Sequence, residues 1–194
     1  MLEESFAQLL NQFAVPVKLN DETNTRKAII SSQNVSDSIP NFDDKTIHSN
    51  FKIQRGDIIH FNNVKYLIIT DVQAKRTYEY KATMRPMTNT FEFTYTTEGE
   101  YHYDRLGNKV WDVEPKEVTE PVSCIAHQEG SPTIEGSQIR LPEERIEVIM
   151  PDDNASSQIK MDSKHTIKNS NYKVVNINLL QSGLRIFTME WTTK

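Results

Sequence analysis

The sequence of 194 residues has little cysteine, little glycine and no long hydrophobic run. With Cys124 as its single cysteine, the chain cannot form an intrachain disulfide or a cysteine-based zinc site. The longest apolar runs are about four or five residues, which is too short to cross a bilayer. The N-terminus is acidic at Glu3 and Glu4 and is not followed by the apolar core of about 7–15 residues that a secretory signal needs. We therefore expect a soluble protein that is made and kept in a reducing compartment.

Basic residues are outnumbered, with 22 Lys+Arg against 27 Asp+Glu and a formal net charge of −5. This balance argues against a protein whose whole surface binds nucleic acid or an anionic membrane. The mean hydropathy of −0.60 and the hydrophobic fraction of 37% are low for a globular chain. However, 8 Phe, 7 Tyr and 2 Trp are too many aromatic residues for a disordered one. The composition is that of a folded protein with polar loops.

Helical periodicity is confined to the first residues of the chain. The apolar positions that form one helical stripe are Leu2, Phe6, Leu9, Leu10 and Phe13. Pro16 follows where it cannot continue a helix. The sequence therefore predicts a short N-terminal helix within residues 1–16. A helix this short must dock its stripe, either on its own domain or on a neighbouring subunit.

From residue 17 onward the pattern is that of short strands separated by turns. Asn62-Asn63 and the segment 105–108 are typical hairpin turns. Prolines and glycines concentrate between residues 114 and 142, which suggests a boundary. The predicted fold is mainly β, with two small antiparallel β-barrel or sandwich modules and a short N-terminal helix.

The predicted domain limits follow from these patterns. The first β module spans residues 17–113, and a linker or extended loop spans 114–142. The second β module spans 143–194, and a strand at 122–126 is a further candidate member of it. Two segments, 58–72 and 164–177, also read alike: each has a strand, an Asn-containing tight turn, and a tyrosine that opens an apolar strand. This repeat favours two related β modules, although any two hairpins share some of these features.

No pattern of residues indicates catalysis or metal binding. The histidines are scattered at His48, His60, His102, His127 and His165. Cys124 and His127 form a Cys-x-x-His pair that lacks a second pair, and the six glycines build no nucleotide-binding motif. Asp43-Asp44 and the segment 152–154 read as solvated turns. We predict no catalytic, cofactor-binding or metal-binding residue, no cofactor, and a protein that is not an enzyme.

Two further patterns have simple structural interpretations. Arg55-Gly56-Asp57 reads as a turn before a strand. The aromatic residues that follow are interleaved with basic and acidic ones and are Tyr78, Tyr80, Phe91, Phe93, Tyr95, Tyr101 and Tyr103. They could form a stacking platform for single-stranded nucleic acid, but nearby carboxylates would repel phosphates. We therefore predict that they are core residues on one face of a sheet.

A resemblance to a known family lies in residues 55–93, which read RGDIIHFNNVKYLIITDVQAKRTYEYKATMRPMTNTFEF. This segment resembles the neck proteins of tailed bacteriophages, namely head-completion, head–tail connector and stopper proteins. Residues 162–191, DSKHTIKNSNYKVVNINLLQSGLRIFTMEW, are similar to the endings of phage structural proteins. The two regions cover about a third of the chain, and their short motifs specify hairpins rather than chemistry. The chain is longer than a minimal single-barrel stopper.

The resemblance implies a virion component assembled in the host cytoplasm. It would form a homo-oligomeric ring, six- or twelvefold, that joins the portal-capped head to the tail and retains the packaged DNA. Its partners would be copies of itself, portal or adaptor proteins and tail proteins, with no membrane. Packaged double-stranded DNA would pass through the channel without sequence-specific contacts, which suits a net acidic subunit. The long segments 31–50 and 114–142 are candidates to reach a neighbouring ring or the channel.

Two other functions stay open on the sequence. The chain could be a tail-completion, distal-tail or baseplate structural protein, because these would share the β modules. A carbohydrate-binding β-sandwich is the third candidate, and it would use Trp111, Trp191 or the tyrosines as a stacking surface.

Overall fold

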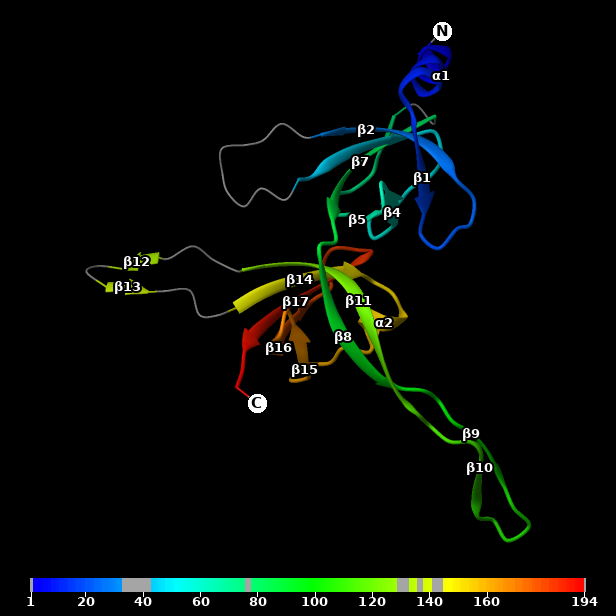
Figure 1. Ribbon diagram of the computed structural model, residues 1–194, viewed down its shortest axis with the longest axis vertical. Coiled ribbons are helices and arrows are strands. Elements are labelled where there is room, and N and C mark those ends of the chain that lie inside the picture. Colours follow the sequence, from blue (N-terminus) through cyan, green and yellow to red (C-terminus); the bar gives the residue numbers. More distant parts are fainter. Residues whose placement is uncertain are drawn as a thin grey trace.

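The computed structural model of the chain describes residues 2–32, 43–75, 78–128, 133–135, 138–140 and 145–193. Two β-barrels follow one another along the chain, with a helix at one end of the molecule and a long hairpin at the other (Figure 1). The prediction of a mainly β fold with two β modules and an N-terminal helix is therefore confirmed. No helix in the described part of the chain is long and apolar enough to span a membrane.

The N-terminal half contains one helix and the first barrel. Its elements are α1 (Leu2–Phe13), β1 (Val15–Leu19), β2 (Arg26–Ser32), β3 (Lys45–Ser49), β4 (Ile58–Phe61), β5 (Val64–Ile68), β6 (Gln73–Lys75) and β7 (Glu79–Pro86). The pairing of β3 with β7 closes six of these strands into a ring, and the short strand β6 is added along β7.

The C-terminal half contains the second barrel and two separate hairpins. Its elements are β8 (Asn89–Thr96), β9 (Glu100–Tyr103), β10 (Lys109–Val113), β11 (Glu117–Gln128), β12 (Thr133–Glu135), β13 (Gln138–Arg140), β14 (Arg145–Pro151), α2 (Asn154–Ser157), β15 (Lys164–Ile167), β16 (Ser170–Asn178) and β17 (Leu184–Trp191). The pairs β9–β10 and β12–β13 are hairpins inserted between strands of the barrel.

Both barrels have the same strand order. Around the first barrel the order is β1-β2-β3-β7-β5-β4, and around the second it is β8-β11-β14-β17-β16-β15. If the six strands of each barrel are counted along the chain, both rings read first, second, third, sixth, fifth, fourth. The hairpins β4–β5 and β15–β16, which contain the two similar sequence segments, occupy the same place in each ring. The internal repeat is thus a repeat of topology.

The turns of these two hairpins have the same backbone conformation. Asn62 and Asn63 have φ values of 48° and 61°, and Lys168 and Asn169 have values of 47° and 66°. A two-residue loop with positive φ at both positions matches the twist of an antiparallel pair, and asparagine tolerates this conformation well. The Asn-containing turns therefore fix the register of both hairpins.

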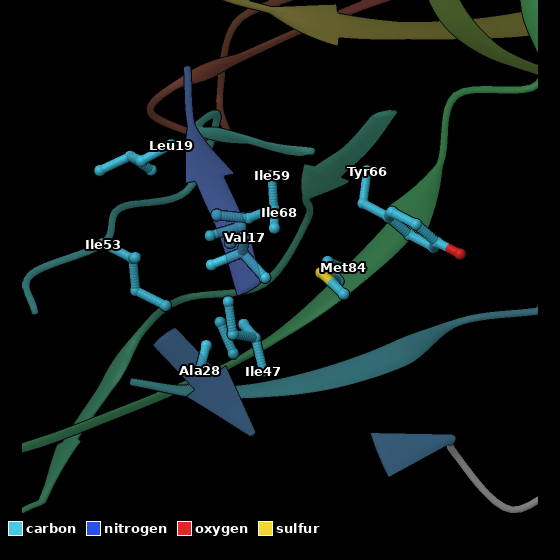
Figure 2. Packing of buried hydrophobic residues seen from close by; sticks show 10 residues of the cluster. Val17, Leu19, Ala28, Ile47, Ile53, Ile59, Tyr66, Ile68 and Met84 are labelled. Atoms are coloured by element: carbon cyan, nitrogen blue, oxygen red, sulfur yellow. The ribbon is translucent and has the colours of Figure 1, made fainter. Parts of the chain in front are cut away.

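Each barrel has its own hydrophobic core. In the first, alternate residues of the strands point inward, and Val17, Ile47 and Ile59 are almost completely buried (Figure 2). In the second, Phe91 and Phe187 are likewise almost completely buried. Burial of such side chains is the main stabilising contribution in small β-barrels, and alternation along each strand delivers them to the interior.

A third apolar cluster joins the two barrels. Leu67 of β5 packs there with Met87, which lies between the barrels, and with residues of the second barrel. The members from the second barrel are Ile125, Ile149, Leu184 and Ile186. Next to this cluster the backbones of Gly56 and Gly183 approach so closely that a Cβ on either would overlap the opposite chain. The barrels are therefore in direct contact.

The structure places the boundary between the modules elsewhere than the sequence pattern suggested. The first barrel ends at Pro86 and the second begins at Asn89, so residues 89–113 belong to the second module and not to a first module of 17–113. Within 114–142, β11 is a barrel strand that pairs with both β8 and β14, and the linker interpretation of its residues is wrong. Val15 and Pro16 likewise belong to β1 and not to the helix. The prolines and glycines of residues 114–142 suggested a linker, because composition does not show that β11 pairs with β8, a strand distant in the sequence.

Candidate assembly surfaces

A long hairpin arm leaves the second barrel between β8 and β11. The two barrel strands pair continuously from Asn89 opposite Cys124 to Thr96 opposite Glu117. The backbone N–H of Thr97 then donates to the Lys116 carbonyl at 2.8 Å, and β9 and β10 follow as a two-stranded ribbon that projects away from both barrels (Figure 1). We call β9, β10 and their turn, residues 99–114, the arm.

One face of the arm is aromatic. Tyr101 lies opposite Trp111 and Tyr103 opposite Lys109, so these four side chains share a face. The Tyr101 ring contacts those of Tyr103 and Trp111 at centroid distances of 5.6 and 5.5 Å. The Lys109 ammonium lies 3.9 Å from the Tyr101 ring centroid and 3.7 Å from that of Trp111. A Cβ on Gly99 would lie 2.7 Å from Trp111, so glycine makes room for the indole.

The aromatic face is open to solvent within this chain. Tyr101, Tyr103 and Trp111 are 47%, 65% and 39% exposed, and Leu106 at the tip is 86% exposed. An isolated two-stranded ribbon is only marginally stable in water, and contiguous exposed apolar groups mark interaction sites. The arm therefore has the composition of a contact surface.

Hydrogen bonds order the tip of the arm. The Asp104 carboxylate accepts from the backbone N–H groups of Leu106 and Asn108, both at 2.8 Å, and from the Asn108 side chain at 3.1 Å. These bonds lower the pKa of Asp104, so the carboxylate stays ionised. On the polar face, His102 bonds to Asp112 at 2.9 Å.

The arm corrects the interpretation of the aromatic series. Phe91 and Phe93 are core residues of the second barrel, as predicted, with exposures of 1% and 3%. Tyr101 and Tyr103 are not core residues, because the ribbon that carries them extends beyond the barrel and meets no second sheet. The side chain of Tyr95 lies outside the described residues. Apart from Tyr78, which precedes β7, the aromatic residues lie in strands as predicted, but periodicity alone cannot tell where a strand leaves its barrel.

The second apolar surface is a groove beside α1. Phe6 and Leu10 are buried on the first barrel, and the Phe6 ring contacts that of Tyr78 at 6.2 Å. Leu9 and Phe13, on the same stripe, stay 47% and 57% exposed. The helix thus docks on its own domain with only half of its stripe, and the other half borders a hollow.

This hollow, which we call the α1 groove, has a volume of about 780 Å³. Its apolar wall consists of Phe6, Leu9, Phe13, Ile29 and Tyr78. Polar residues form the rim, where His48 bonds to the Glu79 carboxylate at 2.8 Å and Lys75 lies 3.8 Å from it. Residues 26–32 and 78–80 gave no sequence signal for a groove, because its walls come together only when the barrel closes.

Cys124 and His127, the Cys-x-x-His pair of the sequence, do not form a reactive or metal-binding site. Cys124 is fully buried in the second core, where burial raises the pKa of its thiol to about 12, and so it is not a reactive thiolate. His127 lies three residues further along β11, so its side chain points to the opposite face of the strand. Its Nε2 atom is 3.4 Å from a carboxylate oxygen of Glu147. The pair cannot share a metal ion. No group of three or more His, Cys, Asp or Glu that could hold a metal occurs among the described residues.

The acidic pairs take part in ion pairs and a helix cap. Asp44 accepts two hydrogen bonds from Arg85, at 2.8 and 2.9 Å, and both side chains are mostly buried. Asp152 pairs with Arg185 at 2.6 Å, and Asp153 is the N-cap of α2 in a capping box. The interpretation of 152–154 as a plain solvated turn is therefore incomplete, since the turn opens a short helix.

The Arg55-Gly56-Asp57 turn has a structural role. Gly56 has a φ of +92°, and Asp57 accepts a hydrogen bond from the Gln54 N–H at 2.7 Å. Arg55 pairs with Asp71. The segment is the turn before β4 that the sequence predicts, and it also forms one side of the contact between the barrels.

Ser163 and His165 resemble a nucleophile and its base, because their side chains are in hydrogen-bond contact. The Ser163 hydroxyl lies 2.8 Å from Nε2 of His165 and 2.6 Å from the Lys160 carbonyl oxygen. Because the carbonyl can only accept, the hydroxyl donates to it, and Nε2–H of the neutral ring donates to the hydroxyl. This is the reverse of the arrangement that activates a serine.

His165 is expected to make the stability of the second barrel depend on pH. The ring packs against Phe91 at 5.3 Å, and burial lowers its pKa below the ordinary value of 6.5. The unfolded chain therefore binds a proton that the folded chain does not, and the free energy of unfolding falls as the pH falls below about 6.5. Urea unfolding measured between pH 7 and 5.5 should show this decrease in the free energy of unfolding. His165→Gln should flatten it, and equal slopes in the two chains would contradict the assignment.

A smaller hollow lies beside the end of β17 in the second barrel. It has a volume of about 460 Å³ and is lined by Tyr172 and Trp191 together with polar groups of Gln128, Arg145 and Ser170. Trp191 is 45% exposed. This hollow, rather than Trp111 with Lys109 over its ring, is the place where a carbohydrate could stack.

The described part of the chain is thus a tandem β-barrel protein with a projecting arm and a helix-bordered groove. Residues 1–86 match the model of the YomX N-terminal domain, and residues 89–190 match that of the YomX C-terminal domain. The chain belongs to the YomX family, and the boundary between the two matches coincides with the boundary between the two barrels. YomX is a protein of the Bacillus phage SPbeta and its prophage, and membership of its family is consistent with a phage origin. Neither the curated proteins nor the solved structures contain a match.

Proposed function

We propose that the chain is a structural, non-enzymatic virion protein that forms a homo-oligomeric neck ring between the portal-capped head and the tail of a phage. The observation that carries this proposal is the arm, because an ordered ribbon with an exposed aromatic face needs a partner surface. The phage family and the resemblance of residues 55–93 to neck proteins support it. Portal or adaptor proteins and tail proteins would be its neighbours.

The architecture suits a ring subunit in two ways. The barrels are held together by an apolar cluster and by direct backbone contact, so that the arm and α1 project from one body (Figure 1). The net charge of −5 suits a channel through which DNA moves without binding. In this role the subunit would help to retain the packaged genome while making no sequence-specific contact with it.

The test is a phage in which a nonsense codon interrupts this gene, grown in suppressing and non-suppressing hosts. Without the protein we expect DNA-containing heads and complete tails that stay unjoined in electron micrographs, and joined particles when the full chain is supplied. Antibody should label the head–tail junction of normal virions. Label at the tail tip, tails of abnormal length, or normal particles without the protein would overturn the neck assignment. The first two results would instead indicate a distal-tail or baseplate protein and a tail-completion protein, respectively.

A further inference from the structure

The hollow beside the end of β17 lies at one rim of the second barrel. Its described lining residues are Gln128, Arg145, Ile146, Ser170, Tyr172 and Trp191, and we call it the β17 hollow. Four neighbouring strands supply residues at their ends, since β11 ends at Gln128, β14 begins at Arg145, β16 begins at Ser170 and β17 ends at Trp191. The mouth of a β-barrel is a common place for a small-ligand site.

One side of the β17 hollow is apolar and aromatic. Ile146 and Tyr172 line it and also pack against the core of the second barrel. Trp191 lies directly opposite Tyr172 in the pairing of β16 with β17, so the two aromatic side chains project from the same face of the sheet. The indole of Trp191 remains about half exposed. The hollow therefore offers aromatic surface on which a flat, apolar ligand face can pack.

The polar groups of the β17 hollow suit a neutral ligand that both donates and accepts hydrogen bonds. The Gln128 amide and the Ser170 hydroxyl each do both. Arg145 is the one charged side chain among the described lining residues, and its Nη2 atom lies 3.9 Å from a carboxylate oxygen of Glu190. Because this charge already has a counter-charge, the hollow does not select a phosphate or carboxylate ligand.

We propose that the β17 hollow binds a neutral saccharide. One face of a pyranose ring presents C–H groups, which pack on Trp191 and Tyr172, and the hydroxyl groups at its edge exchange hydrogen bonds with Gln128 and Ser170. The volume of about 460 Å³ is within the range of small-ligand sites, about 300–1,000 Å³. A nucleobase also stacks, but it offers fewer groups that both donate and accept. This binding activity goes beyond the proposed neck role and does not depend on it.

Saturation-transfer NMR on the full-length chain tests the site. The probes are lactose, maltotriose and chitobiose, with sialyllactose as an anionic saccharide and adenosine as an aromatic compound without a pyranose ring. We expect saturable binding of at least one of the three neutral saccharides, with the strongest transfer to the ring C–H protons that stack. Sialyllactose and adenosine should bind more weakly than that saccharide.

Substitutions then locate the binding. Trp191→Ala should raise the Kd of the bound saccharide about tenfold, because it removes the stacking surface, and Trp191→Phe should keep most of the affinity. The matched control is Trp111→Ala, which removes the similarly exposed tryptophan of the arm and should leave the Kd unchanged. Gln128→Ala changes an exposed side chain, so the barrel stays folded, and should raise the Kd about two- to tenfold.

Each result counts for or against the proposal. If none of the neutral saccharides binds, or if sialyllactose or adenosine binds more tightly, the assigned ligand class is wrong. An unchanged Kd in both Trp191→Ala and Gln128→Ala, or a loss of binding in Trp111→Ala, would overturn the assigned site. Circular dichroism of each variant shows whether its barrels are folded, and Gln128→Ala decides the site if Trp191→Ala is not. These measurements use the purified chain, so they are independent of where antibody finds it in the particle.

Discussion

Replacing Gly183 with alanine is expected to lower the free energy of unfolding by about 3 kcal/mol or more. Gly183 has a φ of +85°, which by itself costs a residue with a Cβ about 1 kcal/mol. In addition, the new Cβ would lie 2.9 Å from the carbonyl carbon of Arg55 and closer still to its oxygen. Both neighbours are backbone atoms, so the contact between the barrels would have to open. Urea unfolding followed by circular dichroism measures the loss.

Gly107 provides the matched control for this substitution. It has almost the same backbone conformation, with a φ of +82°, but a Cβ there would meet no atom within 4 Å. Gly107→Ala should therefore cost only about 1 kcal/mol, from conformation alone. The difference between the two variants isolates the overlap between the barrels. Equal losses would mean that the barrels do not rely on this backbone contact.

Removal of the arm is expected to abolish the joining of heads and tails while leaving the barrels folded. Thr97 and Lys116 are hydrogen-bonded at the base of the arm, at 2.8 and 3.0 Å, so the intervening residues 98–115 can be replaced by an Asn-Gly turn. The core of the second barrel lies far from this cut, and its unfolding transition should move little. The measurement pairs urea unfolding of the purified chain with the count of infectious particles.

The control for the arm keeps its backbone and changes its surface. Tyr103→Ser with Leu106→Ser removes the two most exposed apolar groups of the arm, with no loss of buried side chains. We expect infectivity to fall as it does without the arm. Full infectivity of phage that carries the chain without the arm would show that the arm makes no essential contact. A large drop in the free energy of unfolding of that chain would show that the arm stabilises the second barrel.

The sequence predicted the individual strands and turns of this protein better than the limits of its two β modules. Asn62-Asn63 and the alternation of residues in the strands gave the hairpins correctly, because both signals are local. The pairing of β8 with β11 was missed, since the arm separates the two strands and Pro121 suggested a break. That proline lies opposite Glu92 of β8, and the pairing of β11 with β14 begins only at Ile125. Pro121 is therefore in a part of β11 that has a strand on one side, where proline is tolerated.

The candidate surfaces could be predicted only in part. The apolar stripe of α1 was visible from Leu9 and Phe13, but the groove also needs Ile29 and Tyr78, which only the closed barrel brings beside the helix. Tyr101 and Tyr103 were found as part of an aromatic series, and their exposure was not foreseen. Their alternation is the same in a core strand and in a free ribbon, so only the three-dimensional path of the chain separates the two cases.

The unbroken ladder between β8 and β11 also has a mechanical consequence. It runs from the base of the arm at Thr96 and Glu117 to Asn89 and Cys124 beside the second core. A pull on the arm along its length would draw β8 and β11 in the same direction, so the shear would fall on the hydrogen bonds that join this hairpin to β15 and to β14. Several of these bonds must break at once before the hairpin slides. The hairpin can therefore transmit tension from the tip of the arm to the barrel, which the proposed neck subunit would need when it holds back packaged DNA.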